Sequence, residues 1–224
     1  MMNNLFSIFD PSTSEIYSLN WFSSIYVLLF IPMVYWFSPS RWGVLQLLLT
    51  NLLIKEFSVL LKNKMNLMNL IIFISLFFFI FLNNFLGLFP YIFTSSSHLV
   101  MSLSFSLVLW VSFMLFGWIE NYNHMFIHLV PQGTPFILMP FMVLVESFSN
   151  LIRSGTLSVR LTANMIAGHL LMTLISSTGE SINFLFLLFM LLSQCMLIVL
   201  EISVSLIQAY VFSVLSTLYS TESN

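Results

Sequence analysis

Two apolar stretches of this sequence carry polar side chains at intervals of seven residues. Glu146, Arg153 and Arg160 recur at that spacing in the first stretch, and Glu201 and Gln208 recur in the second. Because seven residues turn an α-helix through almost two full turns, each set lies along one helix face. Carboxylates can bind and release protons, whereas an arginine keeps its positive charge. Each stretch could therefore hold a proton-exchanging group or a fixed charge on an otherwise apolar helix.

Arg160 is the residue whose presence in lipid most needs a reason. An arginine at the centre of a membrane helix costs about 2.5–3.5 kcal/mol on insertion scales. One interpretation is a structural ion pair with Glu146 or Glu201, and the other is a fixed cation on an ion path. Arg153 could form an ion pair with Glu146, or it could extend its guanidinium to a membrane surface.

The remaining polar side chains of the two stretches could assist such a path. Glu201 lies far from both ends of its stretch and could exchange protons near neutral pH or serve only in pairing. His169 lies nine residues after Arg160, on the opposite helix face, and could relay protons or simply hydrogen-bond a neighbour. Asn164 and Gln208 cannot titrate, but both could orient water or hold the guanidinium.

Several kinds of chemistry have no motif in this sequence. We find no nucleophile–base motif, phosphate-binding loop or metal-ligand spacing, so we expect no cofactor and no metal. Cys195 is the single cysteine, which excludes an intrachain disulfide. The net charge of -2 does not suggest a nucleic-acid partner. The function is therefore predicted to be ion movement or assembly, and the chain by itself is not predicted to be an enzyme.

The composition indicates an integral membrane protein. Of the 224 residues 59% are hydrophobic and only 6% are charged, whereas a soluble domain has about 25% charged residues. We expect an all-α fold in which residues 1–224 form a single membrane domain. Runs of about 20 apolar residues predict spanning helices. The predicted elements are spans over 21–37, 70–89 and 99–118, an amphipathic surface helix over 41–66, and two long helices over 136–176 and 181–219.

Charge distribution predicts how these elements face the membrane. The segment 41–66 holds four of the six Lys and Arg residues, so we place it on the matrix or cytoplasmic side and the N-terminus on the other. A continuous helix of about 40 residues is roughly 60 Å long, while the hydrocarbon core is about 30 Å thick. Each long segment must break into two spans or lie steeply tilted. The single polar face of each segment favours two steeply tilted helices in an antiparallel hairpin.

Two stretches of the chain resemble a known family. "LSVRLTANMIAGHLL" (157–171) and "LEISVSLIQAYVF" (200–212) are similar to the signature stretches of subunit a of the rotary ATP synthases, in its mitochondrial form. The resemblance covers nearly the whole chain, and the Phe-, Leu- and Met-rich composition is typical of an animal, insect-like mitochondrial gene product. One position departs from the pattern: the family often has proline directly after the position of Arg153, and this chain has Ser154, which predicts a smaller bend there.

The resemblance implies a proton-translocating stator subunit. Such a subunit lies in the mitochondrial inner membrane, beside a ring of c subunits with mid-membrane carboxylates, and contacts other membrane and peripheral-stalk subunits. It provides two offset half-channels. Here these would pass His169 and Glu201 on one side and Glu146 on the other, with Arg160 between them. Asn164 and Gln208 would assist.

Two other function classes stay open at this point. A stand-alone secondary transporter is one, although such proteins usually show internal repeats and helices broken by Gly or Pro. We find no repeat, and neither long segment has a central proline. A purely structural membrane subunit, whose charges only pair within a complex, is the other.

Overall fold

The computed structural model describes residues 5–32, 38–61, 69–130, 135–179 and 183–222. In these residues all regular structure is helical, and five helices are long and apolar enough to cross a membrane. The predicted all-α membrane class is confirmed at this level. The five are α2 (Arg41–Leu60), α3 (Leu70–Gly87), α4 (Leu99–Glu120), α6 (Met139–Thr178) and α7 (Phe184–Glu222). The shorter elements are η1 (Leu5–Phe9), η2 (Leu19–Phe22), α1 (Ser23–Tyr26), η3 (Val27–Phe30), η5 (Ser95–Ser97), α5 (Tyr122–His128) and η6 (Phe136–Leu138).

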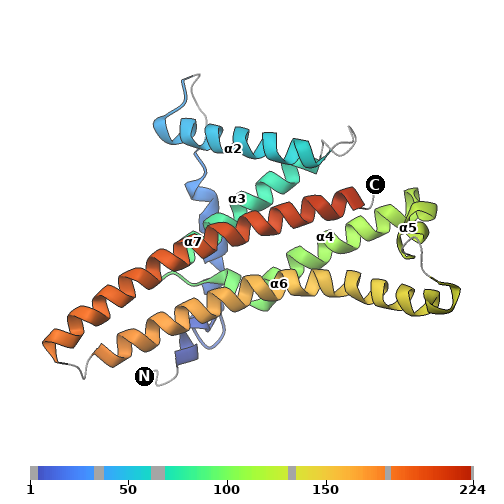
Figure 1. Ribbon diagram of the computed structural model, residues 1–224. Helices are drawn as coiled ribbons and strands as arrows, with labels where there is room; N and C mark the ends of the chain where they lie inside the picture. The colour runs from blue at the N-terminus through green and yellow to red at the C-terminus, as the bar shows by residue number, and fades with distance from the viewer. Residues whose placement is uncertain (1–4, 33–37, 62–68, 131–134, 180–182, 223–224) are drawn as a thin grey trace.

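The two long helices dominate the molecule. α6 has 40 residues and α7 has 39, and neither is broken in the middle. Pro140 lies in the first turn of α6, where the missing N–H costs no helical hydrogen bond. Ser154, unlike a proline, keeps its backbone N–H, and its hydroxyl donates to the carbonyl of Leu151. Figure 1 shows α6 and α7 side by side and antiparallel, with the end of α6 and the start of α7 both at the lower left.

α3 and α4 pack against this pair of helices. α3 packs against α7, α4 packs against α6, and η5 between them touches α6. These helices occupy the predicted ranges 70–89 and 99–118. One apolar cluster joins α3, α6 and α7 and consists of Ile80, Leu157, Leu161, Ala209 and Phe212. A second joins α2 to α3 and consists of Leu53, Phe57, Leu61, Leu70 and Phe73.

The predicted layout of the first 61 residues is not confirmed in detail. The predicted span 21–37 contains only short helical turns up to Phe30, and residues 33–37 lie outside the described residues. The predicted amphipathic helix 41–66 is α2, which ends at Leu60 and is apolar enough to count among the five candidate spans. Two of the charges on which the prediction was based, Lys62 and Lys64, lie outside the described residues. The assignment of three spans and one surface helix is therefore not confirmed.

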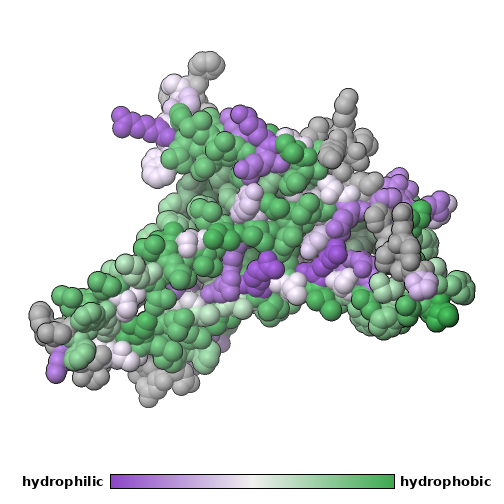
Figure 2. Space-filling view, in the orientation of Figure 1, coloured by the Kyte–Doolittle hydropathy of each residue, from purple (hydrophilic) through white to green (hydrophobic). Residues whose placement is uncertain are grey.

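The surface is mostly apolar. Figure 2 shows green hydrophobic residues over most of the visible face, with hydrophilic residues gathered near the middle of α6 and α7. Large side chains such as Phe141, Phe148 and Leu151 of α6 are more than half exposed. An apolar surface of this extent is suited to contact with lipid or another membrane protein.

Candidate functional site

The helix α7 meets α6 near the middle of both helices, at Gln208 and Arg160. The Gln208 side chain is 6% exposed, and its Nε2 donates to the backbone carbonyl of Arg160 at 3.5 Å. Its Oε1 is buried and has no hydrogen-bond partner among the described residues. The predicted polar face of α7 thus points into the α6–α7 contact at this level.

The carboxyl group of Glu201 lies one step further along the same contact. Glu201 is 8% exposed, and both carboxyl oxygens are buried without a hydrogen-bond partner in the part of the chain that the structure describes. It faces Gly168 of α6: a Cβ placed there would lie 2.5 Å from Oε1 and 2.9 Å from Cδ. Real Cβ contacts are essentially never shorter than 3.0 Å. The carboxyl group therefore occupies space that exists because residue 168 has no side chain.

His169 and Asn164 lie near this contact on α6. His169 is half-buried, and its Nε2 is buried without a hydrogen-bond partner among the described residues. Its ring lies edge-on to the ring of Phe9, with 6.3 Å between centroids. Asn164 is exposed. His169 directly follows Gly168, so its backbone lies one residue from the place where α6 faces the Glu201 carboxyl group.

Arg160 does not form the structural ion pair that one interpretation gave it. Within the described ranges its side chain has no ion pair or hydrogen bond, including with Glu146 or Glu201, and the residue is exposed. Only its backbone carbonyl is engaged, by Gln208. The guanidinium is thus available to a group from outside this chain.

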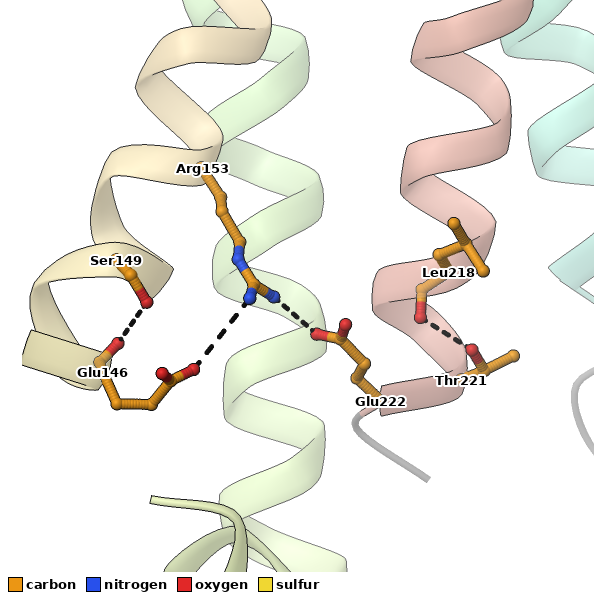
Figure 3. A network of polar contacts seen from close by, with 6 residues as sticks. All are labelled: Glu146, Ser149, Arg153, Leu218, Thr221 and Glu222. Carbon is orange, nitrogen blue, oxygen red and sulfur yellow. Dashed lines mark hydrogen bonds and ion pairs between the residues drawn. The ribbon is translucent and has the colours of Figure 1, made fainter. Parts of the chain in front are cut away.

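Arg153 lies in a second polar cluster, at the far end of the helix pair. Its Nη1 lies 2.9 Å from Glu222 Oε2, and its Nη2 lies 3.9 Å from Glu146 Oε1. Its Cζ is 5.9 Å from the centroid of the Tyr219 ring. Figure 3 shows the guanidinium of α6 reaching between the two carboxylates, one from each long helix. A cavity of about 480 Å³ beside this cluster is lined also by Trp110, Trp118 and Asn150.

Glu222 is a member of this cluster that the sequence reasoning missed. The second long helix was predicted to end at residue 219, whereas α7 continues to Glu222. Glu222 lies 21 residues after Glu201, three intervals of seven, and so on the same face of α7. Extending the seven-residue spacing past Gln208 would have found it.

The Arg153–Glu222 contact is expected to contribute little to stability. Both side chains are more than one-third exposed, and such pairs are worth about 0–1 kcal/mol. Glu222→Gln should lower the free energy of unfolding by less than about 1 kcal/mol, measured by thermal unfolding in detergent. Glu146→Gln, which removes the longer contact of 3.9 Å, is the matched comparison and should cost still less. A larger loss from Glu146→Gln would show that the second contact is the dominant one.

The two clusters lie on either side of Arg160. Glu146 precedes Arg160 by 14 residues, or about 21 Å along a helix. The Glu201 contact with Gly168 lies eight residues after Arg160, about 12 Å in the other direction. No group of three or more His, Cys, Asp or Glu side chains suited to a metal ion occurs in the described residues. The arrangement therefore offers titratable groups at two separated places with an unpaired cation between them.

Comparison with known proteins shows the family of this chain. The family profile described as "ATP synthase A chain" matches residues 17–221. The chain is 58% identical to ATP synthase subunit a of Drosophila melanogaster and 56% identical to that of Aedes aegypti, in each case over the full length of both chains. It is also 58% identical to ATP synthase subunit a of Anopheles gambiae, again over both full lengths. The predicted resemblance is confirmed, and the chain belongs to the ATP synthase A chain family.

Proposed function

We propose that this chain is the proton-translocating stator subunit of a rotary ATP synthase, and that it passes protons to and from carboxylates on a ring of c subunits. The observation that supports this most directly is the exposed Arg160 guanidinium, which has no partner among the described residues. An unpaired arginine inside a membrane is expensive unless a carboxylate or water contacts it. A carboxylate on a neighbouring ring would supply that contact.

Proton uptake would follow the α6–α7 contact at Glu201 and His169. Both side chains have buried nitrogen or oxygen atoms without hydrogen-bond partners in the described structure, and such atoms are commonly satisfied by water. Gln208 has one such oxygen as well. We infer that water between the two helices links these groups to the outside and to the ring. Asn164, exposed one turn after Arg160, would contact the same partner surface.

Release of protons would occur at the opposite cluster. Glu146 lies beside the cavity next to Arg153 and Glu222, on the far side of Arg160. A ring carboxylate that has taken up a proton is neutral and can turn through lipid at low cost, whereas an ionised one cannot. As the carboxylate approaches Arg160, the fixed cation favours its ionised form. The proton must then leave on the side of Glu146 rather than pass directly between the two half-channels.

The arrangement in the membrane is part of the proposal. We place residues 1–224 as a single multi-pass domain in the mitochondrial inner membrane, with α6 and α7 steeply tilted because each is about twice as long as the hydrocarbon core is thick. We place α2 on the matrix surface and let residues 21–37 span instead. Of the five candidate spans α2 has the lowest hydropathy, 1.4, and it carries Lys55 and Glu56 in its interior. Other membrane and peripheral-stalk subunits would cover the remaining apolar surface.

Substitution of Glu201 tests the proposed path. Glu201→Gln keeps the size of the side chain but cannot exchange a proton. We expect ATP synthesis driven by an imposed proton gradient to fall about tenfold while the complex still assembles. This is less than the roughly 10²–10⁴-fold contribution of a positioned acid or base, because water between the helices can still carry protons. Synthesis is to be measured in vesicles, with assembly followed on native gels.

Gln194→Glu is the matched control, since residue 194 lies on the same face of α7 one interval of seven earlier. A carboxylate placed there in the Glu201→Gln background should not restore synthesis, because it lies away from Gly168. Normal proton flux in the Glu201→Gln complex would exclude this residue from the path and favour a purely structural role.

A further inference from the structure

The N-terminal turn η1 packs on α6 next to His169. The Phe9 ring meets the imidazole edge-on, with an interplanar angle of 84° and 6.3 Å between centroids. This pair joins residues 160 positions apart in the sequence, and η1 is in contact with α6 through several residues. Figure 1 shows the N-terminal segment lying against the second half of α6. The contact is thus a tertiary one, and it lies outside the packing of α6 against the other long helices.

The loop after η1 fastens this turn in place. The Ser12 backbone N–H and hydroxyl both donate to Asp10 Oδ1, at 3.0 and 2.7 Å. The Asn20 side chain donates to the Asp10 backbone carbonyl at 3.2 Å, and the Thr13 hydroxyl donates to the Tyr17 carbonyl. These bonds tie the residue directly after Phe9 to the helical turns that follow. Phe9 is therefore held by its backbone and not only by its ring.

Within the described part of the chain, His169 has few polar partners around its imidazole ring. The imidazole has a buried Nε2 without a hydrogen-bond partner in the described residues, so no protein acceptor or donor there fixes its orientation. Glu201 faces Gly168, the residue before His169. In the N-terminal segment, Asp10 directly follows Phe9. Hydrogen bonds from Ser12 hold the pKa of Asp10 below its ordinary value, so this carboxylate stays charged at the outer edge of the contact. Phe9 itself has no group that could bind a proton.

We propose that Phe9 is a positioning residue that covers one edge of the His169 imidazole, fixing the ring plane and limiting water access from the N-terminal side. The edge-on packing of the two rings favours one orientation of the imidazole. The importance of Phe9 for proton uptake rests on the proposed function, but the covering of His169 by Phe9 does not. The two can be tested separately.

The test measures the accessibility of His169 in the assembled complex. Vesicles containing the intact ATP synthase are treated from the outer side with diethyl pyrocarbonate, and modification of His169 is followed by mass spectrometry. In Phe9→Ala we expect the modification rate to rise about fivefold, because the covering ring is gone. Phe9→Tyr should restore the original rate. Phe6→Ala is the matched control, since Phe6 belongs to the same turn but is 67% exposed, and it should leave the rate unchanged.

The outcomes separate the cover from the proton path. An unchanged His169 rate in Phe9→Ala, or an equal rise in Phe6→Ala, would overturn the proposal. If Phe9→Ala does not assemble, Phe9→Leu replaces it, and a rate within the error of wild type in that variant would overturn the proposal in the same way. ATP synthesis measured on the same vesicles tests the role of His169 in proton uptake. Faster modification of His169 with normal synthesis would support the covering role of Phe9 and exclude His169 from the proton path.

Discussion

Arg160→Gln is expected to abolish proton-driven ATP synthesis while the complex still assembles. Glutamine preserves much of the length and polarity of the side chain but removes the charge. A ring carboxylate could then pass residue 160 in its protonated form, because nothing favours ionisation at that point. Protons would cross without driving rotation in one direction. We expect synthesis to fall by at least about 100-fold, or about 2.7 kcal/mol at 1.36 kcal/mol per tenfold, and passive proton conductance to rise.

The structure supplies a control for this prediction in Arg153→Gln. Arg153 lies one interval of seven earlier on the same helix face, but its guanidinium already contacts Glu146 and Glu222 within the chain. It is therefore not free to act on a ring carboxylate, and its loss should reduce synthesis by no more than about threefold, the scale of a partly exposed ion pair. ATP synthesis and proton leak are measured on the same vesicles. Wild-type coupling in Arg160→Gln, or equal damage from Arg153→Gln, would contradict the role given to Arg160.

In the proposed function, a fixed cation at residue 160 prevents protons from crossing the membrane without driving synthesis. One charge that crosses the membrane yields about 2.3 kcal/mol per 100 mV. A direct route for protons past Arg160 would release that energy without synthesis. The insertion cost of an arginine at mid-membrane is about 2.5–3.5 kcal/mol, incurred once on folding, whereas the barrier acts on every proton. The exposed position of Arg160 is consistent with a partner that lowers this cost by supplying a carboxylate.

Much of the site could be predicted because it depends on local spacing. The interval of seven residues placed Glu201 and Gln208 on one face of a continuous helix, and the structure buries both of them against α6. The length and apolar character of α6 and α7 follow from the same stretches, since no proline follows Pro140 in α6. Periodicity within one helix is readable from the chain alone.

Other features could not be predicted because they depend on how distant segments pack. The contact between Gly168 and Glu201 requires the register between two helices, which neither helix specifies alone. The pairing of Phe9 with His169 joins an N-terminal turn to a residue near the end of α6, and neither residue type signals the other. The surface position predicted for residues 41–66 depends on charges that include Lys62 and Lys64 beyond α2, and the length and hydropathy of α2 do not distinguish a surface helix from a span.

Gly168→Ala is expected to be as informative as loss of Glu201 itself, because the added methyl group would occupy the space of the carboxyl group. The new Cβ would lie 2.5 Å from Glu201 Oε1 and 3.2 Å from Cγ. Since the end of a glutamate side chain is flexible, the helices need not separate, and assembly should be preserved. The carboxyl group, however, must move out of its place beside residue 168. We expect proton-driven synthesis to fall about tenfold, the same loss as in Glu201→Gln and less than the roughly 10²–10⁴-fold contribution of a positioned acid or base.

Gly155→Ala and a shortened carboxylate make this expectation specific. A Cβ at residue 155 of the same helix would meet nothing within 4 Å, so that variant should keep full synthesis and gain about 0.5–1 kcal/mol of helix stability.

Adding Glu201→Asp to Gly168→Ala withdraws the carboxyl group by one methylene and should recover part of the lost synthesis, whereas Glu201→Asp alone should lower it. Such a recovery is a coupling between two residues in contact, and the double-mutant cycle measures it directly. If the two losses simply add, the carboxyl group of Glu201 does not occupy the space beside Gly168 in the working enzyme, and proton uptake must use a different route between α6 and α7.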